Sequence, residues 1–382
     1  MAGLGVWLLG APAHDVPERW KYPHRVRGGV MGPTDYQSAN RCALCHDGLY
    51  KQWLDNHAMS WKRPTFQLFY QEILETTGKP YEKECLTCHA PISVAEETYM
   101  VASDIEKEGV TCDFCHTIVV KEGKQYESRP SLLKRGPRHP AFEGSHGVAY
   151  DTSYMRSEFC AVCHEWQSND ILILDEVRVW APTRFAAEGQ QCQTCHMPRF
   201  QGYAAERGGF ERPDVASHEF LGSDDVDFVR QALDLEVEFE RDPEFPEIGI
   251  VRVIVRNKGV AHMTPAGLSW KRYDLIVRIR NADGSRVYWS QMETMKRELA
   301  DRQGNPTFRD WEAVSVLSDT RLRPEEERVY TYRVDLSDLP TDEPFYVSAQ
   351  LFLVRMPKEI YQMLGESPRR PVELLKTFTL VK

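Results

Sequence analysis

The stretch RCALCHDGLYKQWLDNHAMSW, residues 41–61, contains the pattern Cys-x-x-Cys-His, formed by Cys42, Cys45 and His46. A second histidine, His57, follows eleven residues after His46. Thiolate and imidazole groups are common protein ligands for soft and borderline metals. The spacing raises the question of whether His57 is a second ligand for the group that such a motif holds.

The same five-residue pattern occurs five times and accounts for all ten cysteines of the 382-residue chain. Each copy is an attachment signature for c-type haem, in which the thiols bond to the porphyrin and the adjacent imidazole binds the iron. We therefore predict five covalently attached c-type haems. The expected attachment residues are Cys42, Cys45, Cys85, Cys88, Cys112, Cys115, Cys160, Cys163, Cys192 and Cys195. The expected proximal iron ligands are His46, His89, His116, His164 and His196.

Zinc sites and a disulfide framework are two other possible uses of the cysteines. A zinc site does not require a histidine directly after every second cysteine. A disulfide framework is typical of much smaller secreted chains. Both alternatives are therefore weaker than haem attachment.

Seven of the twelve histidines lie outside the motifs and are candidates for the sixth iron position. His57 shares a predicted helical face with Leu49 and Trp53, because these residues are spaced four apart. The remaining candidates lie in Pro- and Gly-rich or strand-flanking segments. The predicted distal ligands are His57, His139, His146, His218 and His262, whereas His14 and His24 are expected to be exposed to solvent.

The character of the sequence changes after His196. A Gly-rich linker leads to LDLEVEFE, residues 233–240, in which apolar and acidic residues alternate as in a half-buried strand. Further strand-like segments follow, and Asp283-Gly284 predicts a hairpin turn between two of them. The expected fold is α+β and multidomain. A mostly helical and loop pentahaem domain (14–225) precedes an antiparallel, immunoglobulin-like β-sandwich (226–382).

The N-terminal segment MAGLGVWLLGAPAHD combines a short apolar run with an Ala-Pro-Ala site, although it lacks a basic region. We interpret residues 1–13 as the remnant of a signal peptide. Attachment of c-type haem takes place outside the cytoplasm, so the expected location is periplasmic or extracellular. No other apolar run approaches the length of a membrane span.

The formal net charge of −10 argues against a nucleic-acid partner, because neutralising phosphates requires a basic surface. The expected partners are redox proteins, either other cytochromes or a membrane quinol-linked complex.

A set of motifs resembles the multihaem cytochromes related to the tetrahaem electron acceptor of hydroxylamine oxidoreductase. These are Leu-Tyr-x-x-Trp after the first motif, Cys-His-Met-Pro at the last, Ser-His-x-Phe at His218, and Asn-x-Gly-x-x-His-x-x-Pro-x-Gly at His262. The resemblance implies that His218 and His262 are distal ligands. Five motifs rather than four prevent a haem-by-haem transfer of the family's order. Some related chains assemble into extracellular filaments.

The expected function is electron transfer through closely spaced haems whose irons are all ligated by two histidines. One alternative is a redox enzyme acting on nitrogen or sulfur oxyanions, for which the loop of Arg135, Arg138 and His139 is the place to look. The other is a homo-oligomer or conducting filament in which His14 or His24 reaches a haem of another molecule.

Overall fold

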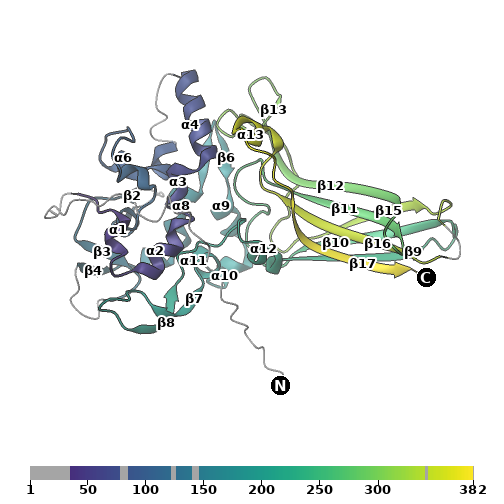
Figure 1. The fold of residues 1–382 in the computed structure, drawn as a ribbon, viewed down its shortest axis with the longest axis horizontal. Helices are drawn as coiled ribbons and strands as arrows, with labels where there is room; N and C mark the ends of the chain where they lie inside the picture. The colour runs from purple at the N-terminus through teal and green to yellow at the C-terminus, as the bar shows by residue number, and fades with distance from the viewer. Residues whose placement is uncertain (1–34, 78–84, 122–125, 140–145, 340–342, 382) are drawn as a thin grey trace.

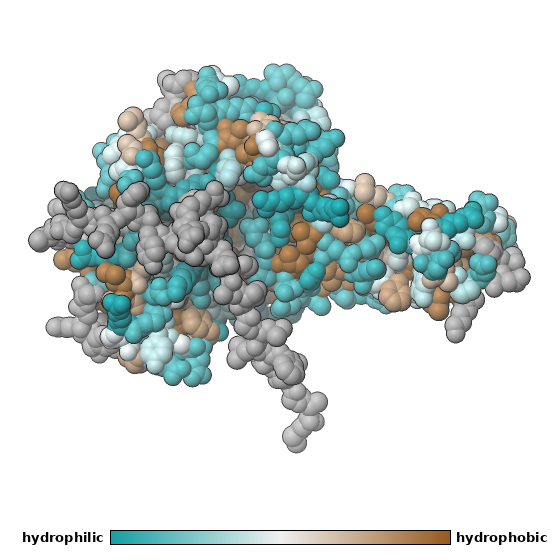
Figure 2. All heavy atoms as spheres, in the orientation of Figure 1, coloured by the Kyte–Doolittle hydropathy of each residue, from teal (hydrophilic) through white to brown (hydrophobic). Residues whose placement is uncertain are grey.

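The computed structural model describes residues 35–77, 85–121, 126–139, 146–339 and 343–381. The predicted signal remnant, His14 and His24 lie outside these ranges. Helices and short strand pairs form one end of an elongated molecule, and long strands form the other (Figure 1). Among the described residues, no helix combines the length and apolar character needed to cross a bilayer. The face drawn in Figure 2 is mostly hydrophilic, with scattered apolar groups on both halves.

The N-terminal half consists of short helices joined by loops and two-stranded pairs. Its helices are α1 (Ala39–Cys42), α2 (Asp47–Leu54), α3 (Met59–Lys62), α4 (Pro64–Thr77), α5 (Thr87–His89), α6 (Pro91–Ala95), η3 (Glu106–Glu108), α7 (Cys112–Cys115), η5 (Thr152–Met155), α8 (Ser157–His164), α9 (Glu176–Trp180), α10 (Arg184–Ala187) and α11 (Cys192–His196). Helix α12 (Val226–Ala232) begins the C-terminal half. Its strand pairs are β1 (Val119–Val120) with β2 (Tyr126–Glu127), β3 (Leu133–Gly136) with β4 (Gly147–Tyr150), β5 (Trp166–Ser168) with β6 (Ile171–Leu174), and β7 (Arg199–Tyr203) with β8 (Glu211–Ala216).

Local capping explains where several of the motif helices begin. The Ser38 side chain accepts a hydrogen bond from the backbone N–H of Asn40 at the start of α1. The Thr111 side chain accepts from the N–H of Phe114 at the start of α7. Such caps satisfy backbone donors that the first helical turn leaves unpaired. The first cap fixes a short helix that ends at Cys42, and the second fixes one that begins at Cys112.

The C-terminal half is built from two antiparallel sheets. The strands are β9 (Leu233–Arg241), β10 (Ile248–Asn257), β11 (Arg272–Asn281), β12 (Val287–Ala300), β13 (Pro306–Thr307), β14 (Ser315–Asp319), β15 (Glu327–Asp335), β16 (Phe345–Val354) and β17 (Val372–Val381), with helix α13 (Lys358–Met363) before the last strand. One sheet has the order β15-β10-β9 and the other β13-β12-β11-β16-β17, with β14 also paired to β12.

Side chains from both sheets share one apolar core. Val237 of β9, Val253 of β10, Leu275 of β11 and Leu351 of β16 all belong to the same buried cluster. The alternation predicted for residues 233–240 appears in β9, where Leu233, Leu235 and Val237 are buried. The predicted combination of helices followed by antiparallel strands is therefore confirmed.

Candidate haem-binding site

A large cavity occupies the helical half and extends to the segment between β10 and β11 and to the residues that follow β16. Its volume is about 1760 Å³, above the range of roughly 300–1,000 Å³ typical of a site for one small ligand. All ten motif cysteines and all five motif histidines line it. Around it the apolar side chains form only small clusters, such as Ala39 with Trp53 and Ala58. The site therefore has the size and the attachment residues that several haems require.

Four of the motif histidines face a second histidine. The distances are between ring centres. The pairs are His46 with His146 at 6.3 Å, His164 with His57 at 6.2 Å, His116 with His218 at 6.3 Å, and His196 with His262 at 6.2 Å. Two metal–imidazole bonds of about 2 Å each, plus about 1 Å from each ring nitrogen to its ring centre, add up to about 6 Å. The spacing thus fits one iron between the rings of each pair.

Hydrogen bonds to backbone carbonyls set the tautomer of most of these rings. The Nδ1 contacts are His46 to Ala204 O (2.6 Å), His89 to Ser60 O (2.6 Å), His116 to Arg135 O (2.7 Å), His196 to Leu221 O (2.5 Å), His146 to Gly147 O (3.0 Å), His218 to Ala216 O (3.0 Å) and His262 to Met263 O (2.9 Å). A carbonyl oxygen only accepts, so Nδ1 must carry the proton. The Nε2 lone pair of each ring is therefore left for a metal.

Burial favours the neutral form of six of the histidines that line the cavity. It lowers the pKa of His57 to about 3 and the pKa values of His89 and His218 to about 4. Burial also lowers the pKa of His116, His164 and His196. A neutral imidazole is the form that binds a metal.

The remaining motif histidine, His89 of the second motif, has a different environment. Its ring stacks on Phe66 with 3.7 Å between ring centres and 9° between the planes. Among the described histidines, none forms such a ring pair with His89. The cysteines and the Nδ1 bond at this site match the others, so only the distal ligand differs.

His139, one of the five predicted distal ligands, lies away from the motif histidines. His139 follows β3, is exposed, and stacks on Tyr150 at 4.0 Å between ring centres. It does not line the cavity, whereas His146, seven residues later, does. The parallel pairing of β3 with β4 places His146, directly before β4, at the cavity, whereas His139 follows β3 at a position away from it. Sequence spacing alone did not distinguish these two histidines.

The cysteines contact one another between motifs without forming disulfides. All ten are free thiols. The side chains of Cys42 and Cys112, of Cys88 and Cys163, and of Cys160 and Cys192 are in hydrogen-bonding contact. In the described part of the chain, no three His, Cys, Asp or Glu side chains are grouped as around a bare metal ion. The attachment points of the first and third motifs, the second and fourth, and the fourth and fifth therefore adjoin.

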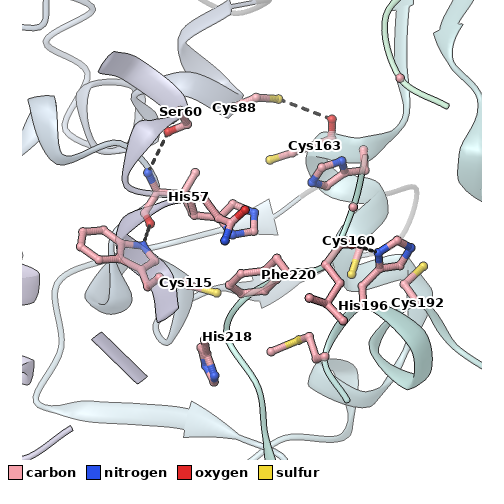
Figure 3. Close-up of a pocket in the computed structure, with 18 of the residues that line it drawn as sticks. His57, Ser60, Cys88, Cys115, Cys160, Cys163, Cys192, His196, His218 and Phe220 are labelled. Atoms are coloured by element: carbon pink, nitrogen blue, oxygen red, sulfur yellow. Dashed lines mark hydrogen bonds between the residues drawn. The ribbon is translucent and has the colours of Figure 1, made fainter. Parts of the chain in front are cut away.

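Phe220 connects two of the distal histidines, a feature that the sequence did not reveal. Its ring makes edge contacts with His57 at 4.2 Å and with His218 at 5.7 Å between ring centres, and Figure 3 shows it between them. Its φ of 47° is rare for a bulky side chain and indicates local strain. The backbone at Phe220 thus holds one aromatic ring against ligands of two different sites.

Comparison with known proteins agrees with this geometry. Residues 41–117, which contain the first three motifs, match the family model of cytochrome c554 and c-prime. The chain is similar in fold to a penta-heme cytochrome c552 from Thermochromatium tepidum, with a TM-score of 0.72, 22% identity, and coverage of 91% of this chain and 99% of that one.

Two other solved structures show much weaker likeness. A Bacteroides uniformis β-glucuronidase has a TM-score of 0.18 at 12% identity and covers 39% of this chain and 12% of its own. The putative ApaA protein from Bordetella pertussis has a TM-score of 0.19 at 14% identity and covers 38% and 90%. Neither value indicates a shared fold, and no curated protein matches the chain. The five motifs, the family match and the common fold together support a multihaem c-type cytochrome.

Proposed function

We propose that this protein is an exported pentahaem c-type cytochrome that carries electrons between redox partners. The observation that carries the proposal is the set of four histidine pairs with ring centres 6.2–6.3 Å apart. Two imidazoles on one iron leave no position for a substrate, so four of the sites suit electron transfer. When bound, the haems supply reversible one-electron chemistry at each iron.

The contacts between motifs define a route for the electrons. The thiol contacts join the His46 site to the His116 site, and the His164 site to both the His89 and His196 sites. Phe220 bridges the His116 and His164 sites through their distal histidines. The route therefore runs from the His46 site through His116 to His164, where it branches.

We also propose a division into two domains, a location outside the cytoplasm and a class of partner. Residues 14–225 form the haem domain and residues 226–382 an immunoglobulin-like sandwich, supported by the two antiparallel sheets that share a core. Haem attachment places the protein in the periplasm or outside the cell. Its partners are other cytochromes or a membrane quinol-linked complex.

The decisive experiment combines intact mass with the spin state of the irons. The mass of the mature holoprotein should correspond to five haems. Electron paramagnetic resonance of the oxidised protein should show four low-spin irons, and the reduced protein should bind one equivalent of carbon monoxide at the His89 haem. Fewer than five haems, or carbon monoxide binding at two or more irons, would contradict the proposal.

A second candidate function rests on His89. An iron without a second histidine can bind a small molecule, which favours a redox enzyme acting on nitrogen or sulfur oxyanions. The two arginines that the sequence suggested for such a site form ion pairs within the chain. Arg135 lies 3.6 Å from Asp151, and Arg138 lies 2.9 Å from Asp214. Turnover of nitrite, hydroxylamine or sulfite with a reduced-dye donor would favour the enzyme. Electron exchange without turnover would favour the carrier.

The filament alternative depends on His14 and His24, which lie outside the described residues. Electron micrographs of the purified protein test it directly. Filaments that disappear in His14→Ala or His24→Ala would identify the protein as a filament subunit.

A further inference from the structure

Three cationic side chains gather where the two halves of the molecule meet in the cavity wall. Arg63 caps the C-terminal end of α3, Lys271 directly precedes β11, and Arg355 follows β16. All three line the cavity, together with Asp224 and Glu176. Three cations beside two carboxylates form a positive region inside a chain whose net charge is −10.

The two arginines share one carboxylate and are partly solvated. Arg63 lies 3.7 Å from Asp224, and Arg355 lies 3.4 Å from it. Arg355 also donates Nε–H to the carbonyl of Ser223 at 3.0 Å. The Asp224 side chain is 67% exposed, so its charge is screened by water and compensates the arginines only weakly.

Lys271 is held more deeply and lacks a direct counter-ion. Its Nζ donates to the Ser223 hydroxyl at 3.0 Å, and within the described ranges no carboxylate lies within ion-pair distance of it. An ammonium has three donors. Burial lowers the pKa of Lys271, while Asp224 and Glu176 oppose that shift. The free donors of Lys271 suit an acceptor that is not part of this chain.

The position of Gly267 keeps the space around this ammonium open. A Cβ built on Gly267 would lie 3.1 Å from the Lys271 Nζ, and the residue has φ +88°. The Gly267 N–H donates to Glu176 Oε1 at 2.7 Å, whereas Glu176 Oε2 is buried with no hydrogen-bond partner. A side chain at position 267 would crowd the Lys271 amine.

We propose that Lys271, Arg63 and Arg355 form an oxyanion site whose occupant is a haem propionate carboxylate at the His164 site. The inference rests on the proposed haem attachment. Lys271 and Glu176 are the charged groups that act on His164, and Arg63 acts on both His57 and His89. The cations thus face the sites of the second and fourth motifs, and the Lys271 charge raises the reduction potential of the adjacent iron. A free oxyanion such as phosphate shares this chemistry and is the other source of an occupant.

The test is redox titration of the holoprotein carrying Lys271→Met, after its mass shows five haems and its spectrum shows the same four low-spin irons as the wild type. Loss of a positive charge stabilises the oxidised iron, so the midpoint potential of one haem should fall while the other four stay unchanged. Lys271→Arg should preserve the potential, because it keeps the charge. Lys376→Met, on the exposed face of β17, is the matched control and should leave all five potentials unchanged.

Titration with inorganic phosphate distinguishes the two sources. An occupied propionate site shows no saturable effect of phosphate, whereas a free-anion site shows one that Lys271→Met abolishes. Arg355→Gln is a second variant if Lys271→Met fails to mature, and it should lower the same potential by a smaller amount. Unchanged potentials together with no phosphate effect, or equal shifts in Lys271→Met and Lys271→Arg, would overturn the oxyanion site. Loss of haem from wild-type protein would instead refute the proposed function.

Discussion

At the scale of single residues, the backbone decides which ring nitrogen meets the metal. Four proximal and three distal histidines direct Nδ1–H to a carbonyl, often one far away in sequence, such as Ala204 for His46 and Leu221 for His196. Such bonds fix both the tautomer and the rotation of the ring. Four of the five proximal sites therefore depend on a segment distant from their own motif.

Replacing His218 tests whether its ring is the second ligand of the iron at the His116 site. His218 pairs with His116, so His218→Ala should convert one low-spin iron to high-spin and add one equivalent of carbon monoxide binding. His139→Ala is the control, because His139 is exposed and contacts Tyr150 rather than a motif histidine. Electron paramagnetic resonance measures both variants. A spin change in His139→Ala, or none in His218→Ala, would show that the ring pairs are wrongly identified.

At the scale of elements, the sequence predicted the strands and turns whose structure is determined by residues close together in the chain. Alternation in residues 233–240 corresponds to β9, and Gly284, with φ +75°, turns the chain between β11 and β12 as Asp283-Gly284 indicated. These signals arise from period-2 burial and from turn geometry. The motif spacing predicted five proximal histidines, and all five line the cavity.

The sequence did not predict which histidines and strands far apart in the chain lie side by side. His57 could be placed on a face near a haem, but no spacing rule selects His164 as its partner. The parallel pairing of β3 with β4, which separates His146 from His139, depends on contacts across the fold. No sequence pattern predicts the position of Phe220, because a strained backbone angle leaves no signature in the composition.

A buried ion pair connects the elements of the two halves. Asp175, at the N-terminus of α9, accepts two hydrogen bonds from Arg321, at 3.1 and 2.5 Å, and the Arg321 side chain is 3% exposed. Arg321→Met would leave a buried carboxylate with only Arg297, at 3.7 Å, as counter-ion. Removing one partner of a buried pair typically costs about 3–5 kcal/mol. Urea unfolding, followed by haem absorbance and tryptophan fluorescence, measures the loss.

The matched control is Arg184→Met, which breaks an exposed pair between Arg184 and Glu325 across the same two halves. Its cost should be about 0–1 kcal/mol. Adding Asp175→Asn to Arg321→Met should recover part of the lost stability, because the unpaired charge is removed. Equal losses for the buried and exposed pairs would mean that burial does not set the strength of this connection.

At the scale of the whole molecule, the two halves are stabilised by different means. The strands β9–β12 and β15–β17 enclose one continuous apolar cluster, whereas the helical half surrounds a large cavity with small clusters. The ring of His262, which lies between β10 and β11, is 6.2 Å from that of His196 in α11, so an iron held by both rings would join the two halves. The haems would thus serve as the core of one half and as a connection to the other.

This difference predicts how the protein behaves without haem. Hydrogen exchange of the haem-free chain, compared with the holoprotein, should show protected amides in β10, β11 and β16 but fast exchange in α2 and α8. Buried apolar packing keeps the strands closed, while helices of eight residues are marginal in water without tertiary contacts. In the holoprotein both halves should be protected. Equal protection of α2 and α8 with and without haem would show that the helical half folds on its own apolar contacts, and that the haems are bound by a structure already formed.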